Sequence, residues 1–278
     1  MDNFEVIELP VQADNKTIFG VMYLPNETRS GKRVPLVIYA HGVGSHHESG
    51  DAYAREFARR GYAVYCLDFG GVEGSKTDGE IGTMTPFTEQ AELEAVYDEL
   101  TGLPYVDLNN VFFMGASLGG AVAALAGAHK NGLIKGLILL YPAFNFPGEI
   151  RRKWKTRDDL PETFTLFQTT AGRVFMEEMY DFDFYDVITK YEGPVLILHG
   201  MSDPMVASGY SVRAVNLYKH AQLELIGEVG HGFEGGAFKY AVKKIVSFLD
   251  EEADLADESG INGDLNFGAP GGMGGMFG

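Results

Sequence analysis

The chain has 278 residues, of which 45% are hydrophobic and 12% aromatic. This size and composition suit one α/β domain with a large core and exclude a wholly disordered protein. The net charge of −17, from 22 Lys and Arg against 39 Asp and Glu, opposes binding to nucleic acid or to an anionic membrane. The single cysteine, Cys66, excludes an internal disulfide and fits a reducing compartment.

The start of the chain lacks the basic and apolar regions of a secretory signal. No stretch has the ~18 consecutive apolar residues of a membrane span. We therefore expect a cytoplasmic protein without a membrane span. The sequence leaves the oligomeric state open.

Short β-rich runs alternate with helical patterns through the first half of the chain. Residues 4–9 and 17–24 are expected to form an opening antiparallel pair. Further strands are expected at residues 35–40, 62–68, 111–114 and 137–141, and helices at residues 52–60, 86–100 and 121–128. Thr85 and Pro86 give the second of these helices an N-cap and a first-turn proline.

The alternation resumes in the last third of the chain. Strands are expected at residues 194–199 and 222–226, and helices at residues 208–220 and 237–249. Strands that alternate with helices predict a mostly parallel central sheet with helices on both faces. Residues 1–249 are expected to form this domain.

Two segments interrupt the pattern. Residues 142–192 are too many for a simple crossover between two strands, so we expect a small inserted lid with a hairpin near residues 170–172. Residues 250–278 contain seven acidic residues and no Lys or Arg, and they end in a Gly- and Met-rich run. Such a tail has the composition of a flexible segment.

A serine flanked by small residues lies between an expected strand and an expected helix, in the sequence G-A-S-L-G at residues 115–119. A sharp strand-to-helix turn exposes a serine hydroxyl for attack. It needs small neighbours because the backbone is strained and the two elements approach closely. Ser117 is therefore the candidate nucleophile.

A nucleophilic serine needs a base, and the base needs an orienting carboxylate. The candidates are His231, in V-G-H-G-F, and Asp203, in H-G-M-S-D-P. Each follows the carboxyl end of an expected strand, and the order Ser, Asp, His is the one expected for this fold. Asp68, at another strand end, is the strongest rival to Asp203.

Hydrolysis also needs two N–H donors for the oxyanion that forms on the substrate. One is expected from Leu118, directly after the nucleophile, and the other from Val43 in the loop H-G-V-G. His41 in that loop is expected to be structural. The run H-H-E at residues 46–48 lacks further ligands at metal-binding spacing, so we expect no metal and no cofactor.

These motifs resemble those of the α/β-hydrolase superfamily over residues 4–249. The matching pieces are H-G-V-G at 41–44, Asp68 with the glycines after it, G-A-S-L-G at 115–119, H-G-M-S-D-P at 199–204 and G-H-G-F at 230–233. Within the superfamily the chain is most similar to bacterial intracellular feruloyl and cinnamoyl esterases. Its H-G-x-G-x-H loop also resembles that of monoglyceride lipases.

The resemblance implies a serine carboxylesterase with the triad Ser117, His231 and Asp203. It also implies that Val43 and Leu118 donate to the oxyanion and that the insertion shapes the substrate pocket. In one departure, the sequence G-V-E-G at residues 71–74 replaces a histidine between glycines that is usual in these relatives.

The expected activity is hydrolysis of small carboxylic esters, feruloyl esters among them, through an acyl-enzyme. Candidate substrate-pocket residues are Trp154, Asp183, Tyr185 and Phe233. The aromatic residues of the insertion are equally expected to pack it against the body. Alternatives are a monoacylglycerol lipase, a thioesterase or a serine peptidase on the same fold, or a hydrolase-like binding protein without activity.

Overall fold

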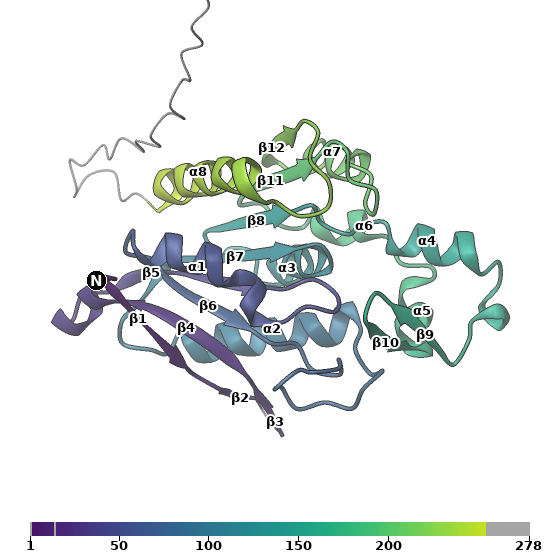
Figure 1. Ribbon diagram of the computed structural model, residues 1–278, viewed down its shortest axis with the longest axis horizontal. Helices are drawn as coiled ribbons and strands as arrows, with labels where there is room; N and C mark the ends of the chain where they lie inside the picture. Colours follow the sequence, from purple (N-terminus) through teal and green to yellow (C-terminus); the bar gives the residue numbers. More distant parts are fainter. Residues whose placement is uncertain (1, 14, 254–278) are drawn as a thin grey trace, which may run out of the picture.

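The protein is described by a computed structural model that covers residues 2–13 and 15–253. Eight strands form one central sheet (Figure 1). In spatial order they are β1 (Phe4–Glu8), β4 (Gly20–Pro25), β6 (Ala63–Leu67), β5 (Val34–Ala40), β7 (Val106–Ala116), β8 (Gly136–Leu140), β11 (Pro194–Gly200) and β12 (His220–Ile226). Strand β4 is antiparallel to both of its neighbours. The remaining strands of this sheet, β6, β5, β7, β8, β11 and β12, run parallel to one another, which confirms the expected mostly parallel sheet.

The opening pair forms as expected, because β1 and β4 are antiparallel. The second expected strand is broken, since a short hairpin of β2 (Val11–Ala13) and β3 (Lys16–Ile18) precedes β4. Asp14, which comes between these two strands in the sequence, lies outside the described residues. Strand β7 is longer than expected, because it begins at Val106, which pairs with Val34 of β5 ahead of a register shift.

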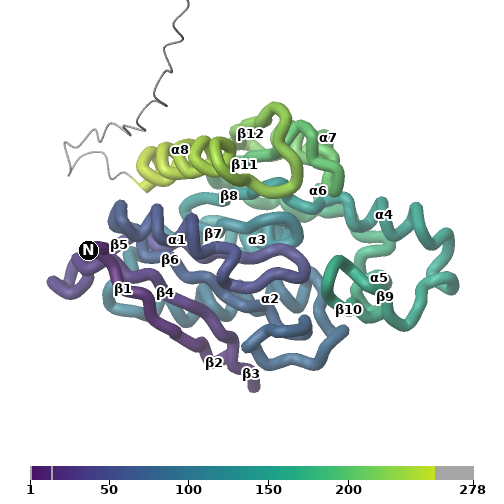
Figure 2. The backbone as a smooth tube through the Cα atoms, in the orientation of Figure 1, coloured from purple at the N-terminus to yellow at the C-terminus, as the bar shows by residue number. Residues whose placement is uncertain are grey.

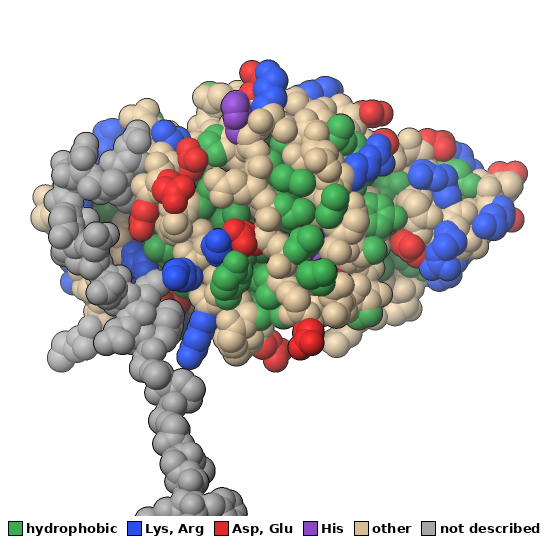
Figure 3. All heavy atoms as spheres, turned by 90° about the horizontal axis from the view of Figure 1, so that it is seen from above, with side chains coloured by type: hydrophobic (Ala, Val, Ile, Leu, Met, Phe, Trp, Pro, Cys, Tyr) green, Lys and Arg blue, Asp and Glu red, His purple; other side chains and the backbone are tan. Residues whose placement is uncertain are grey.

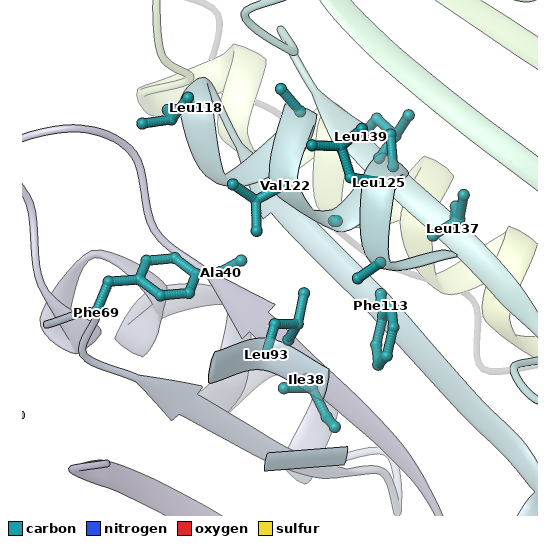
Figure 4. Close-up of a cluster of buried hydrophobic side chains, with 14 of the residues drawn as sticks. Ile38, Ala40, Phe69, Leu93, Phe113, Leu118, Val122, Leu125, Leu137 and Leu139 are labelled. Atoms are coloured by element: carbon teal, nitrogen blue, oxygen red, sulfur yellow. The ribbon is translucent and has the colours of Figure 1, made fainter. Parts of the chain in front are cut away.

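Helices cover both faces of the sheet. Helices α1 (Asp51–Ala58) and α8 (Gly235–Glu252) pack on one face, and α2 (Pro86–Leu100), α3 (Leu118–His129) and α7 (Gly209–Val215) on the other. Alternate residues of β5 belong to two separate core clusters, with Ile38 in one and Val37 in the other. Figure 4 shows the first cluster, in which Leu93 of α2 and Val122 of α3 lie against strand residues.

Helix α2 begins where the sequence predicts. The hydroxyl of Thr85 accepts hydrogen bonds from the N–H groups of Phe87 and Thr88. In return, the hydroxyl oxygen of Thr88 accepts the N–H of Thr85. The expected helix at residues 208–220 is wrong in its second half. It ends at Val215, since His220 begins β12 and pairs with β11.

The insertion between β8 and β11 lies beyond the end of the sheet (Figures 1 and 2). Its elements are α4 (Phe146–Lys153), η3 (Arg157–Asp159), β9 (Thr163–Leu166), β10 (Thr169–Gly172), α5 (Arg173–Met179) and α6 (Phe184–Ile188). Figure 3 shows Lys and Arg side chains gathered at this end of the molecule. The hairpin of β9 and β10 touches the loop before α2, where the Gly172 N–H donates to the Gly82 carbonyl at 3.1 Å.

Two further 3₁₀ turns, η1 (Asn26–Ser30) and η2 (His47–Gly50), flank β5 in the sequence. Helix α8 continues to Glu252, so the first residues of the expected tail are helical. Residues 254–278 of that tail lie outside the described residues. None of the described helices is long and apolar enough to cross a membrane.

Candidate active site

Ser117 occupies a strained turn between β7 and α3. Its backbone has φ 56° and ψ −120°, an unusual conformation for a residue with a side chain. A Cβ on Gly115 would clash with the Gly119 carbonyl, and one on Gly119 would clash with the Ala40 carbonyl. The small residues of G-A-S-L-G are therefore required by the close approach of strand, turn and helix.

The structure brings Ser117, His231 and Asp203 together. The Ser117 Oγ lies 2.9 Å from His231 Nε2, and His231 Nδ1 lies 2.7 Å from Asp203 Oδ2. Since a carboxylate only accepts, the Nδ1–H donates to Asp203 and Nε2 is left to accept from the serine hydroxyl. This tautomer is the one that a serine nucleophile needs.

Asp203 is held from two sides. Its Oδ1 accepts the N–H groups of Met205 at 2.8 Å and Val206 at 2.9 Å, while Oδ2 faces the imidazole of His231. Burial opposes ionisation of this carboxyl, but these donors outweigh it and hold its pKa below the ordinary value. Asp203 is thus an ionised, oriented acceptor.

A second histidine supports this carboxylate. His199 is fully buried, and its Nε2 lies 2.9 Å from the Val206 carbonyl and 3.2 Å from Asp203 Oδ2. Both neighbours accept, so Nε2 carries the proton and Nδ1 accepts from the Ser211 hydroxyl at 2.7 Å. Burial lowers the pKa of His199 and keeps it neutral. Sequence analysis placed His199 only at a strand end and missed this contact.

Asp68 has a different partner. Its Oδ1 accepts from the backbone N–H of His47 at 2.7 Å and from His47 Nδ1 at 2.8 Å. Asp68 therefore pairs with His47, whereas Asp203 pairs with His231. Glu48 also approaches this pair, and the three residues form the one group of potential metal ligands found in the described residues. The Asp68 and His47 ligand atoms are already hydrogen-bonded to each other.

The expected oxyanion donors flank Ser117. Leu118 is the first residue of α3, where an N–H has no acceptor within the helix. On the other side, a Cβ on Gly42 would lie 3.0 Å from Ser117 Cβ, so the H-G-V-G loop lies directly against the serine. Val43 lines the same cavity as Ser117. The two residues whose N–H groups are expected to hold the oxyanion thus lie close to Ser117, one directly after it and one in the loop against it.

His41 fastens that loop. Its Nε2 accepts the N–H of Phe69 at 3.0 Å, and its Nδ1 donates to the Gly42 carbonyl at 2.9 Å. Burial lowers the pKa of His41 to about 4, so the neutral form that this pattern needs is stable. The geometry matches the structural role expected from the sequence.

A cavity of about 620 Å³ opens beside Ser117. Its volume is in the range of small-molecule sites. Among the candidate pocket residues, Phe233 lines it together with Ser117 and His231. Phe167, one of the aromatic residues of the insertion, also lines it. Sequence analysis did not identify other lining residues, which include Tyr39, Ser49, Tyr53, Tyr141 and Met205. Tyr141 follows β8 directly, a strand-end position that was a usable signal.

The other three pocket candidates lie elsewhere. Trp154 packs edge-on against Phe164. Asp183 caps α6 by accepting the N–H of Tyr185. The hydroxyl of Tyr185 donates to the Tyr210 carbonyl, and the ring is buried. Trp154, Asp183 and Tyr185 therefore pack the insertion against itself and the body, and the cavity at Ser117 does not include them.

The tip of the β9–β10 hairpin reaches the cavity instead. Phe167 at this tip has φ 57° and is 50% exposed. The hairpin is tied to the body by Glu73, whose carboxylate accepts the Thr170 N–H at 3.0 Å and the Thr169 hydroxyl. These hydrogen bonds lower the pKa of Glu73 to about 2. The glutamate that replaces the usual histidine thus holds the hairpin tip at the site.

Comparison with known proteins identifies a family and a fold. Residues 31–180, more than half of the chain, match the Hydrolase_4 family, described as "Serine aminopeptidase, S33". Human monoglyceride lipase is 26% identical over 137 residues, which are 48% of this chain and 41% of the lipase. The match therefore spans less than half of that relative.

Solved structures resemble almost the whole chain. Est1E from Butyrivibrio proteoclasticus with ferulic acid bound has a TM-score of 0.80 at 24% identity, covering 88% of this chain and 99% of that one. The Paleococcus ferrophilus monoacylglycerol lipase has a TM-score of 0.64 at 16% identity, covering 84% and 99%. At these identities the likeness shows a shared fold.

Proposed function

Because the chain belongs to the Hydrolase_4 family of α/β-hydrolases and is therefore a hydrolase, we propose that it is a serine carboxylesterase. The observation that carries the proposal is the hydrogen-bonded array of Ser117, His231 and Asp203, of which Ser117 and His231 line a cavity sized for a small ester. The human relative is named a monoglyceride lipase, and Est1E was solved with ferulic acid bound. A monoglyceride is an ester, and ferulic acid is the acid that hydrolysis of a feruloyl ester would release, so both names support the proposal.

The reaction has two steps. Ser117 Oγ attacks the ester carbonyl carbon while its proton passes to His231 Nε2, and the oxyanion faces the N–H groups of Val43 and Leu118. The C–O bond to the alcohol then breaks, and His231 returns the proton to the leaving oxygen. Water next attacks the acyl-enzyme, gives a proton to His231 and releases the acid, after which Ser117 regains its proton. Asp203 holds the imidazole in the required tautomer throughout.

The decisive experiment removes the nucleophile. Ser117→Ala should lower kcat on p-nitrophenyl butyrate by ~10³-fold or more, since the array acts as a unit. The folded state should persist, because Ser117 contributes no cap to α3. A fluorophosphonate probe should label the wild-type protein and not the variant. Wild-type activity in Ser117→Ala would refute the assignment.

We further propose a preference for aromatic acyl groups such as ferulate, with residues 142–192 acting as a lid. Phe167 supports this, because an exposed ring at the hairpin tip lines the cavity. Comparison of kcat/KM on methyl ferulate and on p-nitrophenyl butyrate tests it. Hydrolysis of the butyrate alone would refute the aromatic preference and leave the esterase proposal intact.

Cys66, which is free and buried, supports a reducing, cytoplasmic location.

One observation favours an aminopeptidase as a second candidate. Glu228 and Glu234 line the cavity that contains Ser117, and carboxylates there would attract the ammonium group of a peptide N-terminus. The family's description points the same way. Release of p-nitroaniline from an aminoacyl p-nitroanilide at a rate comparable to p-nitrophenyl butyrate would select the peptidase.

A further inference from the structure

The acid loop (residues 201–206) carries Asp203, and side chains from outside the loop hold its backbone. Within the loop, Asp203 Oδ1 accepts the N–H groups of Met205 and Val206. The carbonyl of Val206 accepts a hydrogen bond from His199 Nε2 at 2.9 Å. The carbonyl of Met205 accepts one from Asn145 Nδ2 at 3.1 Å. The two residues that orient the acid are therefore each held at the N–H and at the carbonyl.

Asn145 reaches the acid loop from the first residues of the insertion. It directly precedes α4, and the N–H of Ala143, two residues earlier, donates to the Ser117 carbonyl at 2.9 Å. Residues 143–145 thus contact the turn of the nucleophile through one hydrogen bond and the acid loop through another. The first and last Cα atoms of three consecutive residues are at most about 7 Å apart, so this segment leaves little freedom in the spacing of the two loops.

The side chain of Asn145 does not serve the helix that follows it. An asparagine at the N-cap commonly accepts an N–H of the first helical turn. Asn145 is the N-cap residue of α4, yet its side chain makes no capping hydrogen bond within this fully described helix. The amide is used on the Met205 carbonyl instead. A role in starting α4 therefore does not account for an amide at this position.

Stability does not account for the amide either. Asn145 is only 9% exposed, and its Oδ1 is sealed from solvent without a hydrogen-bond partner in the described part of the chain. The opposite orientation of the amide would place this oxygen against the Met205 carbonyl, where two acceptors repel. A buried unpaired acceptor costs at least as much free energy as one neutral hydrogen bond contributes, so the amide brings no net stability.

The hydrogen bond from Asn145 bears on the orientation of the acid. The two backbone N–H groups of the acid loop fix Asp203 Oδ1, which leaves Oδ2 to face His231 Nδ1 at 2.7 Å. A shift of the backbone at Met205 would turn the carboxylate and lengthen the bond to the imidazole. A misplacement of about 1 Å in a catalytic array can lower its rate by ~10²-fold. The array therefore depends on what holds this backbone.

We propose that Asn145 is a positioning residue, which couples the insertion to the triad by holding the acid loop against the turn of Ser117. His199 holds the same loop from β11, so the loop is clamped between the sheet and the insertion. The inference rests on the proposed esterase function, because it takes Ser117, His231 and Asp203 as the reacting array. The insertion is then part of the catalytic geometry as well as a cover for the site.

Two substitutions of similar shape separate positioning from stability. Asn145→Leu removes the donor together with the unpaired oxygen, so Tm should change little. Asn145→Asp, assayed at pH 8, keeps the shape and replaces the donor by a carboxylate, which only accepts. In both variants kcat on p-nitrophenyl butyrate should fall by about tenfold to a hundredfold. KM should stay within about threefold, because the described residues that line the cavity do not include Asn145.

The proton between His231 and Asp203 gives a second measurement, which needs no substrate. A proton held between an imidazole Nδ1 and a carboxylate is observed as a low-field ¹H NMR resonance, and its loss in Asp203→Asn would assign it. In both Asn145 variants this resonance should weaken or disappear, because the carboxylate is no longer held toward the imidazole. A role of Asn145 in stability alone would leave the resonance of the folded protein unchanged.

Asn216→Asp is the matched control, because Asn216 Nδ2 also donates to a backbone carbonyl, that of Val212 at 2.7 Å, at the end of α7. Its kcat and its resonance should equal those of the wild type, and thermal melts should show that all variants fold. Wild-type kcat in both Asn145 variants, or an unchanged resonance, would overturn the positioning role. If Ser117→Ala keeps wild-type activity, the esterase proposal fails, whereas the resonance still decides whether Asn145 holds Asp203.

Discussion

Two carboxylate–imidazole pairs lie in loops that follow the carboxyl ends of strands, and they differ in access. His231 and Asp203 are 2.7 Å apart, and His47 and Asp68 are 2.8 Å apart. Both carboxyls have a pKa held below the ordinary value, because hydrogen bonds outweigh the effect of burial. The first imidazole faces Ser117 and lines the cavity, whereas the second packs edge-on against Phe19 and lies outside the cavity lining.

The difference shows that pairing alone does not make a catalytic base. A histidine oriented by a carboxylate serves hydrolysis only when its other nitrogen meets a nucleophile that substrate can reach. The Asp68 pair instead joins η2 to the end of β6, since the backbone N–H of His47 donates to the same oxygen as the ring. We therefore expect Asp203 to control rate and Asp68 to control stability.

The largest effect is expected from Asp203→Asn. The introduced amide oxygen would keep the N–H groups of Met205 and Val206, so its NH₂ would face His231 Nδ1. That forces the proton onto Nε2, which can then no longer accept from Ser117. We expect kcat on p-nitrophenyl butyrate to fall ~10³- to 10⁴-fold with the fold retained. A fall of less than about tenfold would contradict the role of Asp203.

Asp68→Asn should show the reverse pattern. Loss of charge-assisted bonds to His47 should lower the free energy of unfolding by ~1.5–3 kcal/mol, measured in urea. The folded-state pKa of Asp68 lies below the unfolded value of ~3.9, so its contribution is present above that pH and is lost as the pH falls. Wild type and variant should therefore converge in acid. A loss of kcat equal to that of Asp203→Asn would remove the distinction between the pairs.

The sequence could identify the first pair because its motifs lie in short loops. The order Ser, Asp, His and the small residues around Ser117 follow from strand ends and a tight turn, which are local properties. The sequence offers a weaker basis for choosing between Asp68 and Asp203 as the catalytic acid, since both follow strands. The choice depends on which histidine each meets, and strand order across the sheet decides that.

The cavity wall was harder to predict for the same reason. Tyr39 and Tyr53 come from an apolar strand and an amphipathic helix, where an aromatic residue is expected to belong to the hydrophobic core. Trp154 and Tyr185 stood out as pocket candidates, yet both pack within the insertion or against the body. Periodicity tells which residues are buried and does not tell which of them border a hollow.

A smaller effect is expected from Glu73→Gln, at a carboxylate that meets hydroxyl and amide donors instead of an imidazole. The variant keeps the shape and loses the charge that holds Thr169 and Thr170. The hairpin tip with Phe167 should then be held less firmly, and KM should rise by about threefold to tenfold with little change in kcat. Glu162→Gln, at a side chain that is 88% exposed, is the matched control. An unchanged KM would show that the tether does not shape the site.

The smallest effect concerns a buried acid that has no partner at one oxygen. Glu89 on α2 is 2% exposed, and its Oε2 has no hydrogen-bond partner among the described residues. Burial, and then the nearby Glu92, raise the pKa of Glu89 well above its ordinary value. Hydrogen-bond partners lower the pKa of Asp203 and of Asp68, whereas burial raises that of Glu89.

The contribution of Glu89 to stability therefore changes with pH in the opposite direction to that of the paired acids Asp68 and Asp203. The folded state binds a proton that the unfolded state releases above ~4.3, so stability falls as the pH rises from that value through the raised pKa. Glu89→Gln removes this loss and should raise Tm at about pH 8, by ~2–4 °C for each kcal/mol gained. Near pH 4 the difference should shrink toward zero, because both forms are then neutral. A difference in Tm that stays constant between the two pH values would show that Glu89 is ionised in the folded protein, and that a buried carboxylate in this fold does not need an imidazole partner.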